Sequence, residues 1–418
     1  MNKKDWYDLA YAFKKAALWK KINEEELFAV RLPAKKTSSK HIGYCLIMGR
    51  NGEHRALAVY VGEEGFSSYR RIMTDEHQSF ADMLTQDCIQ CSMERKEDLS
   101  EDELLEIREY CQESGVPFRA PFPQFTRYAP YCIPYMPREK GDWQTIRAAL
   151  ETVLKMNEVM TSTGKAALGL RPIEVSRTGQ KYGAEQLCWF PDLPDRQTDQ
   201  VTIPLYSVEN GVLKTERIPL PPPREIRYRE PDRFNEIAIA RMRKNPQKGC
   251  WAAEVIRVPA PVDGDPPYVP AMLMVVDEGG MVRGPVVAEG AEYDPNEIID
   301  KLSEALGSDY PACIQVRTEE TRALLSEFCR KAKIRLEEVQ ESEPLDEAIG
   351  NFLEGVHGSD SDDGEGAGTD LEQILYMLAE MSVEEIRQIP DFVLDQMLMV
   401  PEVLPPDIIA KIKKAKKK

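Results

Sequence analysis

The sequence predicts an α+β domain, then an α/β domain with a mixed sheet, and a small all-α tail. Three features lead to this organisation: a proline cluster at 219–223, an acidic low-complexity stretch at 358–368, and regular strand and helix patterns between them. The predicted parts are 1–218, an α+β domain; 219–230, a proline-rich spacer; 231–357, an α/β domain; 358–368, a disordered acidic linker; and 369–418, short helices with a lysine-rich end.

Periodicity and turn residues define the elements of the first domain. Residues 5–22 have the apolar spacing of an amphipathic helix. Asn51-Gly52 lies between two short apolar runs and is typical of a hairpin turn. Ser100 and Glu103 form a capping box that begins another helix. The other predicted elements are strands at 27–32, 43–48, 56–61, 187–190 and 201–205, and helices from 65, at 100–114 and at 142–160.

The second domain has a more regular order of patterns. After an initial helix, it runs strand, strand, strand, helix, strand, helix, strand, helix. Strands that alternate with helices indicate parallel pairing in part of a sheet. The predicted bounds are helix 231–244, strands 251–258, 271–276 and 281–288, helix 295–306, strand 312–317, helix 319–332, strand 334–339 and helix 345–353.

The last part of the chain is predicted to be separate from the folded body. Residues 358–368 contain no apolar side chain larger than alanine and cannot form a core. Beyond them, Thr369 with Glu372 and Ser382 with Glu385 form two capping boxes of their own. We therefore expect proteolysis within the linker first, and we expect residues 369–418 to be dispensable for folding of the body.

Composition excludes several classes of protein. The chain has 71 acidic and 54 basic residues and a net charge of −17, which repels a phosphate backbone, so nucleic-acid binding is not expected. No apolar run approaches the ~20 residues of a membrane span, and the first residues lack a signal-peptide core. Nine cysteines without an export signal predict a cytoplasmic protein with free thiols and no membrane partner.

Cys88 and Cys91 form a CxxC pair, which is half of a typical zinc motif. A structural zinc site needs a second closely spaced pair, which the sequence lacks. If 88–94 is a strand, the two side chains also point to opposite faces. The sequence therefore predicts no metal site, no cofactor and no stoichiometric zinc in the purified protein.

The segment 117–137 is rich in proline, aromatic residues and arginine. Such rings beside arginines stack on bases or enclose a cation or a peptide. The alternative is an extended crossover whose rings close the core of the first domain. Both interpretations stay open from the sequence. The candidate residues for a ligand or partner surface on this segment are Arg119, Phe122, Phe125, Arg127 and Tyr128.

Two regions resemble domains of an uncharacterised bacterial family. ELFAVRLP at 26–33, GYCLIMGRNGEHRALAVYVGEEGFSSYRRI at 43–72, QDCIQC at 86–91 and PQFTRYAPYCIPYM at 123–136 resemble its N-terminal module. Residues 251–354 resemble the second domain that accompanies it. Both domains are described only as being of unknown function. The resemblance implies a bacterial cytoplasmic protein and brings no activity, cofactor or site residue.

The element order of the second domain is similar to that of the ribonuclease H-like fold, which integrase cores share. The stretch ACIQVRTEETRALLSEFCRKAKIRLEE at 312–338 resembles the corresponding integrase segment. In active members of that fold, one acid comes from the first strand, where Glu254 lies, and another from the first helix, which has Glu297 and Asp300. A further acid is expected at the end of the fourth strand. Arg317 occupies that region, and a guanidinium repels a divalent metal.

Two functional hypotheses follow. The first is a non-catalytic binding, regulatory or adaptor protein that recruits an unidentified protein partner through 369–418. In it, Arg317 is the sixth candidate surface residue and binds a carboxylate or phosphate of the partner, unless it simply ends a strand in solvent. The alternative is a metal-dependent nuclease or phosphoryl-transfer enzyme built on 231–357. The sequence leans against an enzyme and identifies no catalytic residue.

Overall fold

The computed structural model describes residues 3–33, 42–50, 52, 54–74, 84–172, 202–221, 226–283, 285–306, 310–358 and 406–416. The chain divides into two compact units, Met1–Ile349 and Gly350–Lys418. The predicted strand 187–190, the predicted linker beyond Gly358 and the helices predicted at Thr369 and Ser382 lie outside the described residues. Within the described residues, no helix is long and apolar enough to cross a membrane.

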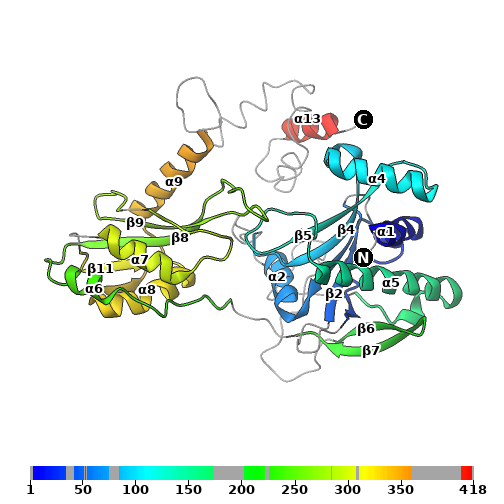
Figure 1. The fold of residues 1–418 in the computed structure, drawn as a ribbon, viewed down its shortest axis with the longest axis horizontal. Coiled ribbons are helices and arrows are strands. Elements are labelled where there is room, and N and C mark those ends of the chain that lie inside the picture. The colour runs from blue at the N-terminus through cyan, green and yellow to red at the C-terminus, as the bar shows by residue number, and fades with distance from the viewer. Residues whose placement is uncertain are drawn as a thin grey trace. The chain divides into compact units, whose positions relative to one another are not determined.

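The first domain is built on a seven-stranded sheet with the order β5-β4-β3-β2-β1-β6-β7 (Figure 1). Neighbouring strands are antiparallel except for β1 and β6, which are parallel. The strands are β1 (Phe28–Arg31), β2 (Ile42–Met48), β3 (Ala56–Val61), β4 (Cys88–Glu94), β5 (Phe122–Tyr128), β6 (Thr202–Glu209) and β7 (Val212–Pro219).

Helices cover both faces of this sheet, which explains why its central strands are almost continuously apolar. α1 and α5 bring Phe13 and Ile146 to a core on one face, and α2 brings Phe66 to a core on the other. The helices are α1 (Lys3–Ala16), α2 (Gly62–Thr74), α4 (Glu101–Ser114) and α5 (Lys140–Thr163), with 3-10 turns η1 (Leu18–Lys20), η2 (Lys96–Asp98) and η3 (Lys165–Leu168).

Local signals in the sequence correspond to caps and turns in this domain. The predicted capping box is present, because the Glu103 amide donates to Ser100 Oγ at 3.3 Å and Ser100 N donates to Glu103 Oε2 at 2.9 Å. Asn210 and Gly211 join β6 to β7 with φ angles of 49° and 76°, as a tight hairpin with the strands' own twist requires.

The second domain contains a five-stranded sheet with the order β10-β9-β8-β11-β12. The β8–β9 and β9–β10 pairs are antiparallel, whereas β8, β11 and β12 are mutually parallel. This mixed sheet confirms the predicted fold class, and β8, β9, β10, α7, β11, α8, β12 and α9 follow one another in the predicted order of strands and helices. The strands are β8 (Cys250–Arg257), β9 (Ala271–Val276), β10 (Val286–Val287), β11 (Cys313–Val316) and β12 (Arg335–Glu338).

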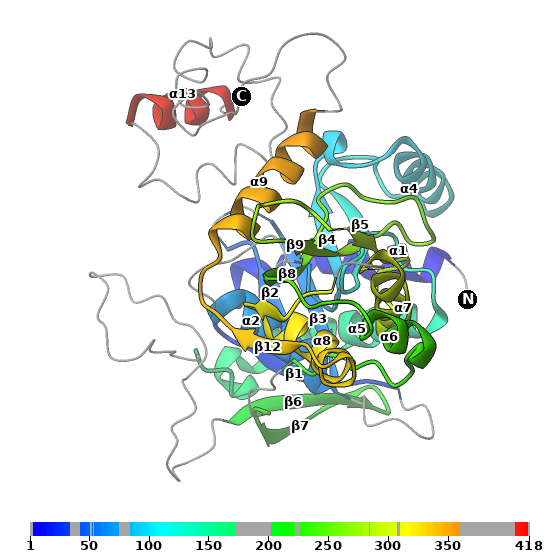
Figure 2. The same ribbon diagram turned by 90° about the vertical axis from the view of Figure 1, so that its left-hand side faces the viewer.

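Helices α6 (Glu236–Met242), α7 (Pro295–Leu306) and α8 (Glu319–Ala332) contact one another and enclose the core of the second domain (Figure 2). Phe328, Leu324 and Leu302 are fully buried there against strand residues such as Leu273. α9 (Glu343–Gly358) follows β12. In the second unit the structure describes α13 (Pro406–Lys416), which contains part of the lysine-rich end.

Some boundaries differ from the expected ones for local reasons. The first helix ends at Ala16, because Ala17 has a left-handed φ of 46°. The helix expected at 231–244 begins only after Asn235, whose side chain accepts from the Ala238 amide at 3.0 Å. The strand expected at 281–288 is shorter than predicted: β10 covers Val286–Val287, and Val282 forms a single bridge with Val276. The segment 117–137, interpreted either as a binding surface or as an extended crossover, contains β5, an edge strand of the first sheet.

Candidate functional site

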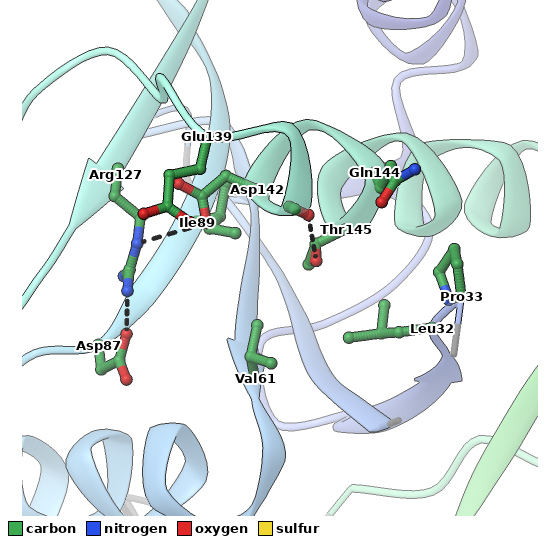
Figure 3. A pocket seen from close by; sticks show the side chains of 11 residues that line it. Leu32, Pro33, Val61, Asp87, Ile89, Arg127, Glu139, Asp142, Gln144 and Thr145 are labelled. Carbon is green, nitrogen blue, oxygen red and sulfur yellow. Dashed lines mark hydrogen bonds and ion pairs between the residues drawn. The ribbon is translucent and has the colours of Figure 1, made fainter. Parts of the chain in front are cut away.

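A pocket of about 320 Å³ lies where β4, β5 and the beginning of α5 meet in the first domain (Figure 3). One part of its wall is apolar and includes Val61 and Ile89, which are strand residues, and Leu32, which follows β1. The other part carries the charged side chains of Asp87, Arg127, Glu139 and Asp142. Arg127 is therefore the one of the six predicted surface residues that lines this pocket.

The Arg127 guanidinium forms ion pairs and hydrogen bonds with several neighbouring groups. Its Nη2 lies 2.6 Å from Asp87 Oδ1, and its Nε lies 3.7 Å from Asp142 Oδ1 (Figure 3). Its Nη1 donates to the carbonyl oxygens of Cys88, at 3.1 Å, and Tyr128. The side chain is 18% exposed. The guanidinium thus joins β4, β5 and the first turn of α5 and organises the pocket.

The electrostatics of the pocket favour a positively charged ligand. Burial disfavours the charged guanidinium, but the neighbouring carboxylate of Asp87, with that of Asp142, raises the pKa of Arg127 above its usual range. The three carboxylates of Asp87, Glu139 and Asp142 exceed this single cation, and Glu139 is exposed. A cationic group of a ligand is therefore attracted, and an anion is repelled.

The other candidate residues of the segment 117–137 have different surroundings. Phe122 and Phe125 are only 3% and 2% exposed and belong to the core of the first domain, so they are corrected here from surface to core side chains. Phe125 packs edge-on against Trp143 of α5. Tyr128 is half-buried against the core on the opposite face, and Arg119 is exposed.

Part of the same segment contacts the second domain. Ile133 N donates to Pro267 O at 2.9 Å, and Val269 N donates to Tyr131 O at 2.8 Å. The Tyr131 ring also lies under the guanidinium of Arg257, 3.6 Å from the ring centroid to Cζ. These contacts join the segment 117–137 to the second domain, while its phenylalanines pack in the core of the first domain.

Arg257 is part of a buried cluster that the sequence analysis did not identify. Its Nη2 donates to Glu320 Oε1 at 3.1 Å, and Tyr293 Oη donates to the same oxygen at 2.9 Å. The Arg257 side chain is 5% exposed. Burial and the nearby Glu320 carboxylate raise the pKa of Tyr293 well above its usual range, so it stays a neutral donor. An arginine at the end of a largely apolar strand, β8, was the available signal.

Arg317 stands directly after β11 and does not end in solvent. Its Nε donates to Glu254 Oε2 at 2.6 Å, and its Nη1 donates to Asp346 Oδ1 at 2.5 Å. Glu254, on β8, is 15% exposed and Arg317 is 19% exposed. Burial disfavours its charge, yet the bonds to Asp346 and Glu254 raise the pKa of Arg317. We call this group, Glu254, Arg317 and Asp346, the Arg317 triad.

Glu254 and Arg317 of the triad stand at two positions for which the ribonuclease H-like resemblance of the sequence implies acids. Glu254 comes from the first strand of the sheet, and Arg317 follows the fourth. Glu297, one of the acids considered on the first helix, forms an i,i+4 pair with Lys301 at 2.5 Å instead. The carboxylate of Glu254 is therefore neutralised by an internal arginine.

The CxxC pair lies on β4, as the sequence analysis expected for a strand with opposed cysteines. Cys88 belongs to the core on the α2 face, and Cys91 belongs to the core on the α1 and α5 face. Burial raises the pKa of the Cys88 thiol to about 12, and that of Cys91 is raised further. Two neutral thiols on opposite faces cannot share a metal ion.

Comparisons with family models match two parts of the chain. Residues 4–170 match the family model described as a domain of unknown function, DUF7309, and residues 238–353 match a second one, DUF6930. No curated protein matches the chain.

Solved structures with weak similarity are retroviral integrases. The simian T-cell lymphotropic virus intasome in complex with PP2A regulatory subunit B56 gamma matches at 15% identity and a TM-score of 0.21, over 29% of this chain. The match spans 45% of that chain, which is less than half of its length. The magnesium complex of the HTLV-2 integrase catalytic core domain in its dimeric form matches at 15% identity and a TM-score of 0.20, over 31% of this chain and 82% of that chain. Similarities at this level do not bear on activity. Residues 4–170 and 238–353 of the chain thus correspond to two domains of unknown function, DUF7309 and DUF6930.

Proposed function

We propose that the chain is a non-catalytic binding or adaptor protein. The observation that carries this proposal is the Arg317 triad, in which the arginine forms ion pairs with the carboxylates of Glu254 and Asp346. Two-metal phosphoryl transfer requires several carboxylates that converge on divalent cations about 3.5–4 Å apart. A guanidinium 2.6 Å from Glu254 fills the space next to that carboxylate and repels a cation.

The Arg127 pocket supplies the binding chemistry in this proposal. Its excess of carboxylates suits an ammonium or guanidinium group, and its apolar wall of Leu32, Val61 and Ile89 suits the aliphatic stem that carries such a group. A lysine or arginine side chain of a protein partner combines both. The tail 369–418 is proposed as a second region that recruits the partner.

The alternative, a metal-dependent nuclease, has one observation in its favour. Glu254 and Asp346 come from different elements and meet within hydrogen-bonding distance of the same guanidinium. If Arg317 moved away, two carboxylates would remain near one another. This alternative requires rearrangement of the triad before a metal binds.

The binding proposal is tested by affinity capture from native cytoplasm, with quantitative comparison of four baits. These are the full chain, a 1–357 truncation, Glu139→Gln in the pocket, and Glu158→Gln as the matched control. Glu158 is exposed on the same helix, α5, outside the pocket, and its side chain pairs with the neighbouring Lys155. We expect a protein that the full chain and the control retain and that the truncation or Glu139→Gln depletes.

Equal retention by the four baits would contradict the adaptor function. If all four baits retain the same proteins in equal amounts, neither the pocket nor the tail binds a partner, and the adaptor function is contradicted. Circular dichroism of each bait shows whether depletion reflects unfolding.

A further inference from the structure

Two cysteines and a glutamate meet at one end of the parallel strands of the second sheet. Cys250 begins β8 and Cys313 begins β11, and the two residues are directly opposite each other in the parallel register. Glu337 lies on the next strand, β12. The two Sγ atoms and a Glu337 carboxylate oxygen all lie within 4.8 Å of one another.

The two sulfurs are joined by a disulfide in this structure, with Cα atoms 4.4 Å apart. This corrects the expectation of free thiols for these two residues. The parallel register places them together, although they are 63 residues apart in sequence. Cys313 is 1% exposed, whereas Cys250 is half-buried, so the pair lies at the margin of the core.

The surroundings of the cysteines are ionic. The Cys250 amide donates to Glu278 Oε1 at 2.6 Å, which places a carboxylate beside the backbone of that residue. Glu337 pairs with Arg335 at 2.7 Å, but the Arg335 side chain is 70% exposed and flexible enough to turn into solvent. The carboxylate of Glu337 is then available to a cation.

We propose that the reduced form of this site binds a thiophilic divalent cation of the zinc class through Cys250, Cys313 and Glu337. Two thiolates and one carboxylate are a ligand set that zinc accepts, with a fourth position for water. Zinc–sulfur bonds of about 2.3 Å require the sulfurs to separate from bonding distance, by rotation of the two side chains. Binding of the cation by the two thiols releases two protons.

The disulfide is the metal-free state in this proposal. A small-molecule disulfide such as oxidised glutathione converts the dithiolate to the protein disulfide by two exchange steps. One sulfur–sulfur bond of the oxidant breaks, one forms between Cys250 and Cys313, two glutathione thiolates leave, and the cation is released. A dithiol reductant or phosphine reverses the change. The site therefore holds metal only when it is reduced.

The test uses the full chain, reduced with a phosphine under anaerobic conditions, and cadmium as the probe. Thiolate-to-cadmium charge transfer gives an ultraviolet band that reports sulfur ligation. We expect one cadmium per chain, loss of the band in Cys250→Ser and in Cys313→Ser, and an affinity at least about tenfold lower in Glu337→Gln. Cys329→Ser is the matched control, because Cys329 is buried on α8 outside the cluster.

Each result decides the proposal. Oxidised glutathione should abolish the band, and the phosphine should restore it. The absence of a band in the reduced protein, or a band unchanged in Cys250→Ser, overturns the site. An affinity unchanged in Glu337→Gln overturns the three-ligand assignment. Because Cys250 is half-buried, its serine variant is expected to fold even if that of the buried Cys313 does not.

Discussion

Replacement of Arg127 with alanine is expected to lower the free energy of unfolding of the first domain by about 3 kcal/mol. The change removes the one cation among the described side chains that line the pocket. Asp87, which is 24% exposed, and Asp142, which is 18% exposed, then lose their ion pairs with Arg127. It also removes the bonds to the carbonyls of Cys88 and Tyr128. This value is at the lower end of the stability losses that follow removal of one partner of a buried ion pair, because Asp87 and Asp142 are partly exposed to solvent. Denaturant unfolding of the full chain, followed by tryptophan fluorescence, measures the effect.

Arg147→Ala is the matched control for this change. Arg147 pairs with Glu151 at 2.8 Å on the same domain, but both side chains are more than 40% exposed, so a loss below about 1 kcal/mol is expected. Asp87→Asn in the Arg127→Ala background should recover part of the loss, because it removes an unpaired charge. Equal losses in Arg127→Ala and the control would show that the pocket charges are solvated and unimportant for folding.

Replacement of Arg317 with alanine is expected to lower the free energy of unfolding of the second domain by about 3 kcal/mol. Glu254 is 15% exposed on a central strand, and without the guanidinium its charge has lost both of the contacts that Nε and Nη2 supply. Asp346 is 57% exposed and contributes little to the loss. Denaturant unfolding, with hydrogen exchange of strand amides to assign the effect to this domain, gives the value.

Two further variants test whether the Arg317 triad accounts for this loss of stability. Arg322→Ala removes an exposed arginine that pairs with Glu319 on α8, and it should cost less than about 1 kcal/mol. Glu254→Gln combined with Arg317→Met should be more stable than Arg317→Ala, because no uncompensated charge remains. If Arg317→Ala unfolded no more easily than Arg322→Ala, the triad would be a surface contact of no structural weight.

Much of the fold was predictable because its signals are local. The predicted helices over 295–306 and 319–332 and the strands over 56–61 and 271–276 agree with α7, α8, β3 and β9 at both ends. Each has a strong apolar pattern and a clear boundary, such as Pro295 at the first position of α7. The regular strand and helix order then led to the mixed sheet of the second domain.

The features that were missed depend on contacts between distant residues. β5 contains Pro123 and lies at the edge of its sheet, where proline is tolerated, so its sequence resembles a loop. The Cys250–Cys313 bond follows from strand register, which spacing alone does not reveal. Asp87 and Asp142 become partners of Arg127 only when β4, β5 and α5 are assembled.

The predicted surface residues also show the difference between local sequence signals and contacts that form only in the folded chain. Proline, arginine and aromatic composition selected Arg119, Phe122, Phe125, Arg127 and Tyr128 together, but composition does not assign a face. In the structure the two phenylalanines are core residues, whereas Arg127 lines the pocket. The interpretation of Arg317 as a residue that opposes metal binding rested on its position after the fourth strand. The ion pair with Glu254 supports it.

The central claim, that the second domain is non-catalytic, is tested most directly by nucleic-acid cleavage. The full chain and Glu254→Gln are incubated in parallel with single-stranded, duplex and hybrid substrates in magnesium or manganese. Because Arg317 neutralises Glu254, we predict that neither protein cleaves any substrate above a mock-purified control. Cleavage by the full chain that Glu254→Gln abolishes would contradict the account and establish a metal-dependent nuclease.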